Sequence, residues 1–92
     1  MSDRIVEASD IFRALGGETR LKILRFIEDE ERCVHEITEE LEMTDSNISH
    51  HLRKLKDRDI VTKRKEGRHR YYELSDQHIK DIIQAGVEHA DE

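Results

Sequence analysis

The architecture of this chain follows from residues 44–55, which read Thr44-Asp45-Ser46-Asn47-Ile48-Ser49-His50-His51-Leu52-Arg53-Lys54-Leu55. Here Ile48, Leu52 and Leu55 recur at the i, i+4 and i+7 spacing of one helical face, which predicts a helix with that face buried. The polar residues at the start supply the turn and N-cap chemistry that begins a helix. We therefore expect a helix that extends to about residue 58. Its exposed face would carry Ser46, Ser49, His50, Arg53 and Lys54, with Asn47 at its margin.

The elements predicted on either side of this helix follow a known order. A short helix is expected over residues 34–42, and two strand-like runs, 60–66 and 69–74, flank a hairpin tip at Gly67. Two helices come earlier, one that ends at Gly16-Gly17 and one over residues 18–28, and a last helix follows Ser75. A short helix, a tight polar turn, a longer helix and a basic hairpin make a winged helix-turn-helix. The sequence thus predicts a mainly α (α+β) fold with the order α-α-α-α-β-β-α, in which residues 1–92 form a single domain.

The charges are segregated along the chain. The formal net charge is −6, which by itself argues against a nucleic-acid partner. Between Ser46 and Tyr72, however, nine Lys and Arg stand against three acidic residues, whereas the rest of the chain has seven basic and nineteen acidic residues. The basic segment could contact phosphates, and the acidic remainder would be repelled by them. Because a charge run is most often only a solvated face, this pattern supports DNA binding only together with the helix and the hairpin.

The exposed helical face and the hairpin together predict a DNA-binding set. Small polar side chains at the start of the helix can reach base edges in the major groove, and the basic side chains farther along the helix lie near phosphate. The hairpin tip could contact the backbone or an adjacent minor groove. The predicted set is Ser46, Asn47, Ser49, His50, Arg53, Lys54, Arg68 and Arg70. We expect His51 to pack beside the buried stripe, and one of Tyr71 and Tyr72 to face inward.

Length and composition narrow the class of protein. Ninety-two residues make a small domain that gains stability from association, and with 4% aromatic residues its core must be aliphatic and thin. No apolar segment approaches the length of a membrane span, and the first residues lack the apolar stretch of a signal peptide. The single cysteine excludes an internal disulfide. We therefore expect a cytoplasmic protein that forms a dimer and has no membrane partner.

The last seventeen residues contain four good metal ligands, which are Asp76, His78, His89 and Glu92. At about 100° per residue, the two histidines point within roughly 20° of each other, and Glu92 lies one turn beyond His89. Rising about 1.5 Å per residue, the helix separates these histidines by roughly 16 Å, too far for one ion. An antiparallel second copy would set Asp76 and His78 of one chain against His89 and Glu92 of the other. The result would be two equivalent sites related by a two-fold axis.

The same helix has an apolar stripe, the ordinary face for packing onto a domain. It consists of Ile79, Ile82, Ile83, Gly86, Val87 and Ala90. Ala85 and Gly86 are small where two crossing helices would need their backbones close. Simpler roles remain open for the four ligands. Asp76 could be only an N-cap, the histidines ordinary surface residues, and Glu92 simply the last residue.

Four runs of the sequence carry a family pattern. They are Leu15-Gly16-Gly17-Glu18-Thr19-Arg20-Leu21-Lys22-Ile23-Leu24, Cys33-Val34, Ser46-Asn47-Ile48-Ser49-His50-His51-Leu52-Arg53-Lys54-Leu55 and Gly67-Arg68-His69-Arg70-Tyr71-Tyr72-Glu73-Leu74. Together they resemble the ArsR/SmtB family of metal-responsive repressors. The resemblance covers nearly the whole chain. It implies a homodimeric winged helix whose first and last helices form the interface, with a helical-pair zinc site of the pattern D-x-H, then H-x-x-E or H-x-x-H. Asp76-x-His78 and His89-x-x-Glu92 match the acidic version at every ligand.

Two imidazoles and two carboxylates in a closed tetrahedron suit Zn²⁺, with Co²⁺ as a surrogate. We expect the metal-free dimer to bind an inverted repeat in operator DNA with its two reading helices about one DNA turn, roughly 34–36 Å, apart. Metal would favour an arrangement that no longer matches this spacing. By linkage, DNA would weaken metal binding by the same factor. The resemblance implies an operator upstream of metal efflux or sequestration functions.

The family also has a second kind of metal site, built on a Cys-Val-Cys or Cys-Val-Gly segment and often on an N-terminal arm. Here the segment reads Glu31-Arg32-Cys33-Val34-His35-Glu36. Cys33 and Glu36 occupy possible ligand positions, but His35 replaces the second cysteine, and the arm before Ile5 has neither Cys nor His. Such a site would be vestigial, and the scarcity of thiolates argues against arsenite as the signal.

Three other functions are weighed against metal sensing. A winged-helix dimer could bind DNA constitutively, or sense something other than metal, with incidental ligands at its C-terminus. A metal-dependent hydrolase would need an open coordination position, a general base and a substrate pocket. The sequence shows no spare catalytic set beside the four ligands, so we expect neither an enzyme nor a small organic substrate. A protein-binding winged helix would not need the basic hairpin.

Overall fold

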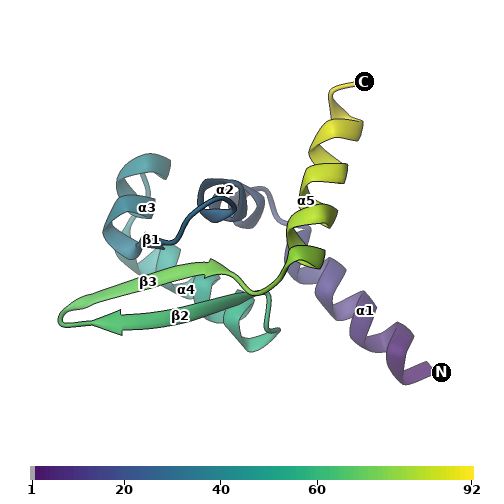
Figure 1. Ribbon diagram of the computed structural model, residues 1–92, viewed down its shortest axis with the longest axis horizontal. Helices are drawn as coiled ribbons and strands as arrows, with labels where there is room; N and C mark the ends of the chain where they lie inside the picture. Colours follow the sequence, from purple (N-terminus) through teal and green to yellow (C-terminus); the bar gives the residue numbers. More distant parts are fainter. Residues whose placement is uncertain (1) are drawn as a thin grey trace.

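The computed structural model describes residues 2–92 as a winged helix-turn-helix (Figure 1). Its helices are α1 (Ser2–Leu15), α2 (Glu18–Ile27), α3 (Val34–Leu41), α4 (Asp45–Asp57) and α5 (Gln77–Ala90). Its strands are β1 (Arg32–Cys33), β2 (Val61–Glu66) and β3 (His69–Leu74). The predicted fold class is confirmed, with α3 and α4 as the helix-turn-helix and β2–β3 as the wing. Within residues 2–92, none of the helices is long and apolar enough to cross a membrane.

The sheet has three antiparallel strands in the order β1-β3-β2, of which the sequence predicted only two. Arg32 and Cys33 of β1 pair with Tyr72 and Tyr71, on the edge of β3 that β2 leaves open. A strand of two residues is too short to produce the alternation by which strands are recognised in a sequence. The consequence is that the loop after α2 is tied directly to the wing.

The core is aliphatic, as predicted. Ile48, Leu52 and Leu55 are fully buried, which confirms the stripe predicted for α4. The remaining buried apolar side chains come from every helix and from the base of the wing, namely Ala14, Leu15, Ile23, Leu24, Ile27, Val34, Ile37, Ile60, Val61, Tyr72, Ile79 and Ile83. Leu41 is only half-buried because it lies at the end of α3. The burial of one face of α4 leaves its opposite face directed outward.

Local chemistry sets the boundaries of α1, α4 and the wing. Helix α1 ends at Leu15, before the predicted stop at Gly16-Gly17. Thr44 is the N-cap of α4, and its Oγ1 accepts a hydrogen bond from the Asn47 N–H at 3.1 Å, which satisfies a donor that the first turn of a helix leaves without a partner. At the tip of the wing Gly67 has a φ of 62°, a conformation that costs glycine little.

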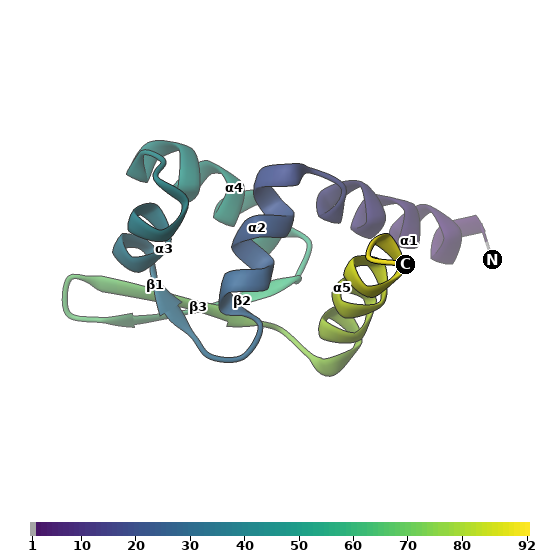
Figure 2. The same cartoon turned by 90° about the horizontal axis from the view of Figure 1, so that it is seen from above.

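Helices α1 and α5 keep large apolar side chains exposed. Ile5 is 70% exposed, Val6 57%, Phe12 58% and Ile82 37%. Figure 2 shows both helices at the end of the molecule opposite the tip of the wing. The prediction that the whole apolar stripe of α5 packs onto the domain was wrong, because only Ile79 and Ile83 are buried. The second half of α5 extends past the rest of the chain (Figure 1), so its apolar side chains have no core of their own to cover them.

Candidate DNA-binding surface and C-terminal ligand pairs

The outward face of α4 is polar and basic. Five of the predicted DNA-binding residues on this helix are exposed, and Ser49 is half-buried; the exposed ones are Ser46, Asn47, His50, Arg53 and Lys54. Positions three and four residues apart share a helical face, so this set forms one continuous surface. Small side chains occupy its N-terminal end and positive charges its C-terminal half. This arrangement suits a helix that reads a major groove at its start and meets phosphate farther along.

The pairing of β2 with β3 fixes the positions of the basic residues of the wing. Lys65 pairs with Arg70, and Lys63 pairs with Tyr72, across the β2–β3 ladder, so all four side chains lie on one face of the hairpin. Tyr72 is buried and Tyr71 is half-buried, as the predicted alternation requires. Burial raises the pKa of the Tyr72 hydroxyl, and the positive charges of Arg70 and Arg53 oppose that rise. Helix α4 packs against β2, so the basic side chains of the wing lie next to those of α4.

Arg64 lies on the other face of the wing, where its charge is engaged within the protein. Its Nη2 is 2.6 Å from Glu31 Oε1, its Nη1 is 2.6 Å from Glu66 Oε2, and its guanidinium stacks 4.6 Å from the ring centre of Tyr71. The hydrogen bond from Arg64 lowers the pKa of Glu31, and the two carboxylates raise the pKa of Arg64. Arg64 thus anchors the wing to the loop that precedes β1.

His51 packs against the body of the protein, as predicted. It is half-buried, and its Nδ1 accepts a hydrogen bond from Arg20 Nε at 3.2 Å. Arg20 also donates to the carbonyl oxygen of Ala14 at 3.3 Å. Burial, followed by the positive charges of Arg20, His50 and Lys54, lowers the pKa of His51. A neutral His51 is therefore part of the contact that joins α1, α2 and α4.

Two of the four predicted metal ligands meet at the start of α5. Asp76 is the N-cap of this helix, and its Oδ1 accepts a hydrogen bond from the Ile79 N–H at 3.1 Å. The same oxygen lies 3.8 Å from His78 Nδ1. The simpler role considered for Asp76, helix capping, is therefore real, and the carboxylate nevertheless stands beside an exposed imidazole.

The other two predicted ligands lie at the far end of the helix. His89 is in the last turn of α5, and Glu92 follows it, with the Glu92 N–H donating to the His89 carbonyl oxygen at 3.2 Å. Both side chains are exposed. Within residues 2–92 of one chain, no three His, Cys, Asp or Glu side chains are grouped closely enough to hold a metal ion. Each chain thus has one carboxylate–imidazole pair at the start of α5, and at the other end His89 lies in the helix and Glu92 beyond it, so four-fold ligation of one ion would require two chains.

Cys33 and Glu36 form a capping box at the start of α3. The Cys33 N–H donates to Glu36 Oε1 at 3.0 Å, and Arg32 Nη1 donates to Oε2 at 3.4 Å. The pKa of Glu36 is lowered, chiefly by the hydrogen bond from the Cys33 backbone. His35 lies 3.0 Å from Glu39 along α3. These contacts give Cys33 and Glu36 a structural task at a helix terminus.

The sequence did not predict a groove between α1 and α4. This groove has a volume of about 630 Å³ and is lined by Asp10, Arg13, Ala14, Arg20, Lys54, Asp57 and Arg58. Only Lys54 was among the predicted DNA-binding residues. The basic side chains of the groove come from α1, α2 and the end of α4. The sequence does not specify how these helices pack, so no spacing along the chain could have identified the groove.

Comparison with known proteins agrees with this architecture. Residues 17–63 match the family described as "Bacterial regulatory protein, arsR family". The chain is 42% identical over 82 residues to an uncharacterized HTH-type transcriptional regulator of Methanocaldococcus jannaschii, covering 88% of this chain and 92% of that protein. It is 36% identical over 85 residues to the cadmium resistance transcriptional regulatory protein CadC homolog of Staphylococcus aureus, covering 91% of this chain and 70% of that protein. It is 35% identical over 85 residues to the HTH-type transcriptional repressor SmtB of Mycobacterium tuberculosis, covering 92% and 63%.

Solved structures give the same result. The homodimeric winged helix-turn-helix DNA-binding domain of a possible ArsR-family regulator from Mycobacterium bovis superposes with a TM-score of 0.90 at 26% identity, covering 98% of this chain and 83% of that one. HlyU from Vibrio cholerae superposes with a TM-score of 0.87 at 33% identity, covering 92% of each chain. The resemblance seen in the sequence is confirmed, and the class is one of transcription regulators, not of enzymes. The chain belongs to the ArsR/SmtB family of winged helix-turn-helix transcriptional repressors.

Proposed function

We propose that this repressor senses a metal ion: its metal-free homodimer binds operator DNA, and zinc bound between the C-terminal helices releases it. The observation that carries the proposal is the division of the ligands on α5, with Asp76 and His78 at one end and His89 and Glu92 at the other. Two relatives have names that refer to cadmium resistance and to SmtB. Those names support a metal as the signal.

A dimer follows from the uncovered apolar side chains of α1 and α5. Ile5, Phe12 and Ile82 would be shielded from water if the two helices packed against a second copy, and exposed apolar side chains grouped on a surface typically mark such a contact. The solved relative from Mycobacterium bovis is described as homodimeric. With a two-fold axis beside α5, the start of this helix in one chain would lie against its end in the other.

The donor set fits zinc. Nitrogen and oxygen ligands at a four-coordinate tetrahedral site are typical of Zn²⁺, and Co²⁺ accepts the same ligands. Asp76 can keep its hydrogen bond to the Ile79 N–H through Oδ1 while Oδ2 approaches an ion. Four protein ligands leave no open coordination position, which suits a regulatory site and not a hydrolytic one.

The metal would act by changing how the two DNA-binding surfaces are held. When bound, it supplies a bridge between the two α5 helices. In a dimer, each protomer must place its predicted DNA-binding residues on one of two successive turns of DNA, which are about 34 Å apart. These residues lie on α4 and, with Arg68 and Arg70, on the wing. A dimer constrained at α5 would present them at another spacing. Coupling between two such sites typically amounts to about 1–3 kcal/mol, or roughly 5- to 150-fold in affinity.

The experiment that tests this proposal is a fluorescence-anisotropy titration of a labelled inverted-repeat duplex with and without zinc. The parent, His89→Ala and the control His35→Ala are compared. His35 is a suitable control because it is an exposed histidine on α3 that contacts Glu39. Zinc should weaken DNA binding by the parent and by His35→Ala within the 5- to 150-fold range of such couplings, and it should have little effect on His89→Ala.

The alternative function is a DNA-binding regulator that does not respond to metal. It predicts that zinc changes the affinity of none of the three proteins. A release by His89→Ala as large as that of the parent would show that any metal response arises elsewhere in the chain.

A further inference from the structure

The groove between α1 and α4 gathers positive charge from three helices. Four of its lining residues are basic, Arg13, Arg20, Lys54 and Arg58, and two are acidic, Asp10 and Asp57. Helix α1 packs against both α2 and α4, so the walls of the groove are parts of the folded body. In a chain whose net charge is −6, a concave site with an excess of bases would concentrate anions.

A carboxylate orients two of these bases. Asp10 Oδ1 lies 3.3 Å from Arg13 Nη1, and Asp10 Oδ2 lies 3.3 Å from Arg58 Nη1. The Asp10 side chain is 25% exposed, whereas the Arg13 and Arg58 side chains are 77% and 53% exposed. Each guanidinium has five N–H donors, so one contact with Asp10 fixes its position and leaves other donors for a ligand in the groove.

Arg20 is held in the same wall by different partners. Its Nε donates to His51 Nδ1 and its Nη1 to the carbonyl oxygen of Ala14. Both acceptors are uncharged, because the pKa of His51 is lowered by burial and by the neighbouring positive charges. Among residues 2–92, no carboxylate forms an ion pair with Arg20, so its positive charge adds to the electrostatic field in the groove.

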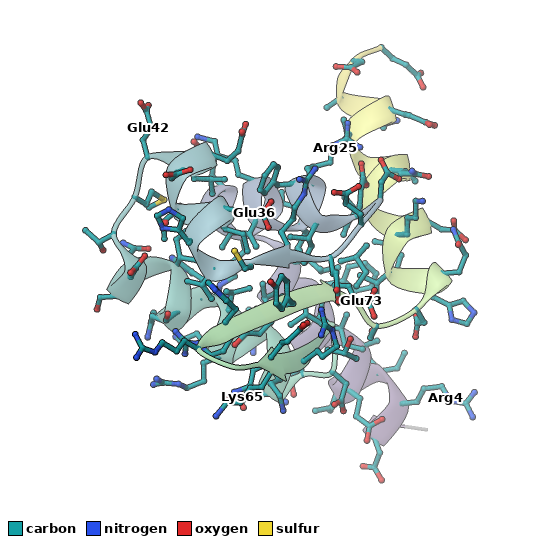
Figure 3. All side chains as sticks on the ribbon, turned by 60° about the vertical axis from the view of Figure 1, so that its left-hand side comes forward. Arg4, Arg25, Glu36, Glu42, Lys65 and Glu73 are labelled. Carbon is teal, nitrogen blue, oxygen red and sulfur yellow. The ribbon has the colours of Figure 1, made fainter. Side chains whose placement is uncertain are left out.

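The groove continues the predicted DNA-binding surface. Lys54 belongs both to the outward face of α4 and to the lining of the groove. In Figure 2, α4 and α1 lie along the same side of the molecule, and the two helices pack against each other. Figure 3 labels Lys65 on the wing and Arg4 near the start of α1. A duplex that meets α4 can therefore pass along this side of the molecule.

We propose that the groove between α1 and α4 binds a phosphate of the DNA backbone, with Arg13, Lys54 and Arg58 as its donors. The ligand class is a phosphodiester, which guanidinium groups bind through paired charge-assisted hydrogen bonds. The inference rests on the DNA-binding half of the proposed function and is independent of the metal response. The groove would add a phosphate contact, which carries no sequence information. This contact is separate from those made by the base-reading end of α4 and by the wing. Because Arg13 is on α1 and Arg58 is the C-cap of α4, the contact forms only when these helices keep their present relation.

The test is the salt dependence of binding to a mixed-sequence duplex of about 30 base pairs, long enough for two half-sites one helical turn apart. The parent is compared with Arg58→Gln, Arg13→Gln and the control Lys22→Gln. Lys22 lies on α2 outside the groove, is exposed, and contacts Glu18 at 3.1 Å, so its replacement changes the net charge equally. Circular dichroism and sedimentation establish that each variant is folded and has the parent's oligomeric state.

The logarithm of the binding constant falls with the logarithm of the salt concentration by about 0.9 for each phosphate contact. Arg58→Gln in both protomers should therefore make the slope shallower by about 1.8, Arg13→Gln should shift it in the same direction, and Lys22→Gln should leave it near the parent's. Slopes for both arginine variants equal to that of Lys22→Gln would overturn the proposal.

A second measurement locates the phosphate itself. Neutral methylphosphonate linkages are placed one at a time along the inverted-repeat duplex of the zinc titration, whose half-sites fix the register of the protein. One linkage per half-site should weaken binding by the parent and weaken binding by Arg58→Gln much less; a scan without such a linkage refutes the groove contact. The zinc titration of the same proteins is a separate readout. A failed groove contact leaves zinc release intact, and a failed zinc response leaves the salt slopes unchanged.

Discussion

Arg20 Nε lies 3.2 Å from His51 Nδ1 and donates a hydrogen bond to it. The bond requires the lone pair of a neutral imidazole. Since Arg20 also donates to the Ala14 carbonyl oxygen at the end of α1, one side chain connects α1 to α4. The protonation state of His51 is thereby linked to the packing of α4 against α1 and α2.

This link predicts a pH dependence of stability. The pKa of His51 is lowered from its usual 6.5, first by burial and then by the charge of Arg20. The unfolded chain therefore takes up this proton more readily than the folded chain, so the contribution of His51 to stability is complete above about pH 6.5 and is lost as the pH falls below that value.

His51→Gln supplies the comparison. A glutamine oxygen can accept the hydrogen bond from Arg20 without titrating. In urea unfolding at about pH 7.5 and about pH 5.5, the parent should lose more stability on acidification than His51→Gln does. Equal losses in the two proteins would show that the contact does not control the acid sensitivity.

The arginines of the wing should contribute unequally to DNA binding. Arg64 is engaged by Glu31 and Glu66, whereas Arg70 lies on the face shared with Lys65 and Tyr72. Arg70→Gln should lower the affinity for a mixed-sequence duplex and make its salt dependence shallower by about 0.9 per protomer. Arg64→Gln, which removes the same charge, should change both much less. A loss for Arg64→Gln as large as that for Arg70→Gln would mean that Arg64 leaves its carboxylate partners to bind DNA.

The exposed side chain of Phe12 should be a main contributor to dimerisation. Burying a phenylalanine is worth about 1.5–3 kcal/mol, so covering one in each protomer would contribute about 3–6 kcal/mol, equivalent to roughly 10²- to 10⁴-fold in the dimer dissociation constant. Phe12→Asp should therefore sediment as a monomer at concentrations where the parent is dimeric. Thr62→Asp, at an exposed position of the wing, is the control and should remain dimeric. A dimer of unchanged strength in Phe12→Asp would place the interface elsewhere.

The sequence predicts most of this fold because its main signals are local. The buried stripe of α4, the glycine stop after α1 and the turn at Gly67 each depend on residues that are neighbours in the chain, and the structure has all three. Strand β1 was missed because its pairing depends on the open edge of β3, about forty residues away in the register of Cys33 with Tyr71.

The limits of sequence interpretation are clearest on α5 and at the groove. Periodicity placed Ile79, Ile82 and Ile83 on one apolar stripe, but it could not show that the core covers Ile79 and Ile83 and leaves Ile82 exposed. Likewise, Asp10 and Arg58 are far apart in sequence, and their 3.3 Å contact arises only because α1 packs on α4. Helical spacing indicates which side chains share a face, and only tertiary packing determines what that face meets.

The central claim is that each metal ion is held by two chains, and a mixed dimer tests it directly. If Asp76 and His78 of one chain join His89 and Glu92 of the other, a homodimer of His78→Ala and a homodimer of His89→Ala each lack one ligand in both sites. A heterodimer of the two variants has both losses in one site and keeps the other site complete. The measurement is zinc stoichiometry, by competition with a chelator, of the heterodimer purified through two different tags. The account predicts about one tightly bound zinc per heterodimer and none in either homodimer. A heterodimer that binds zinc no better than the two homodimers would contradict it.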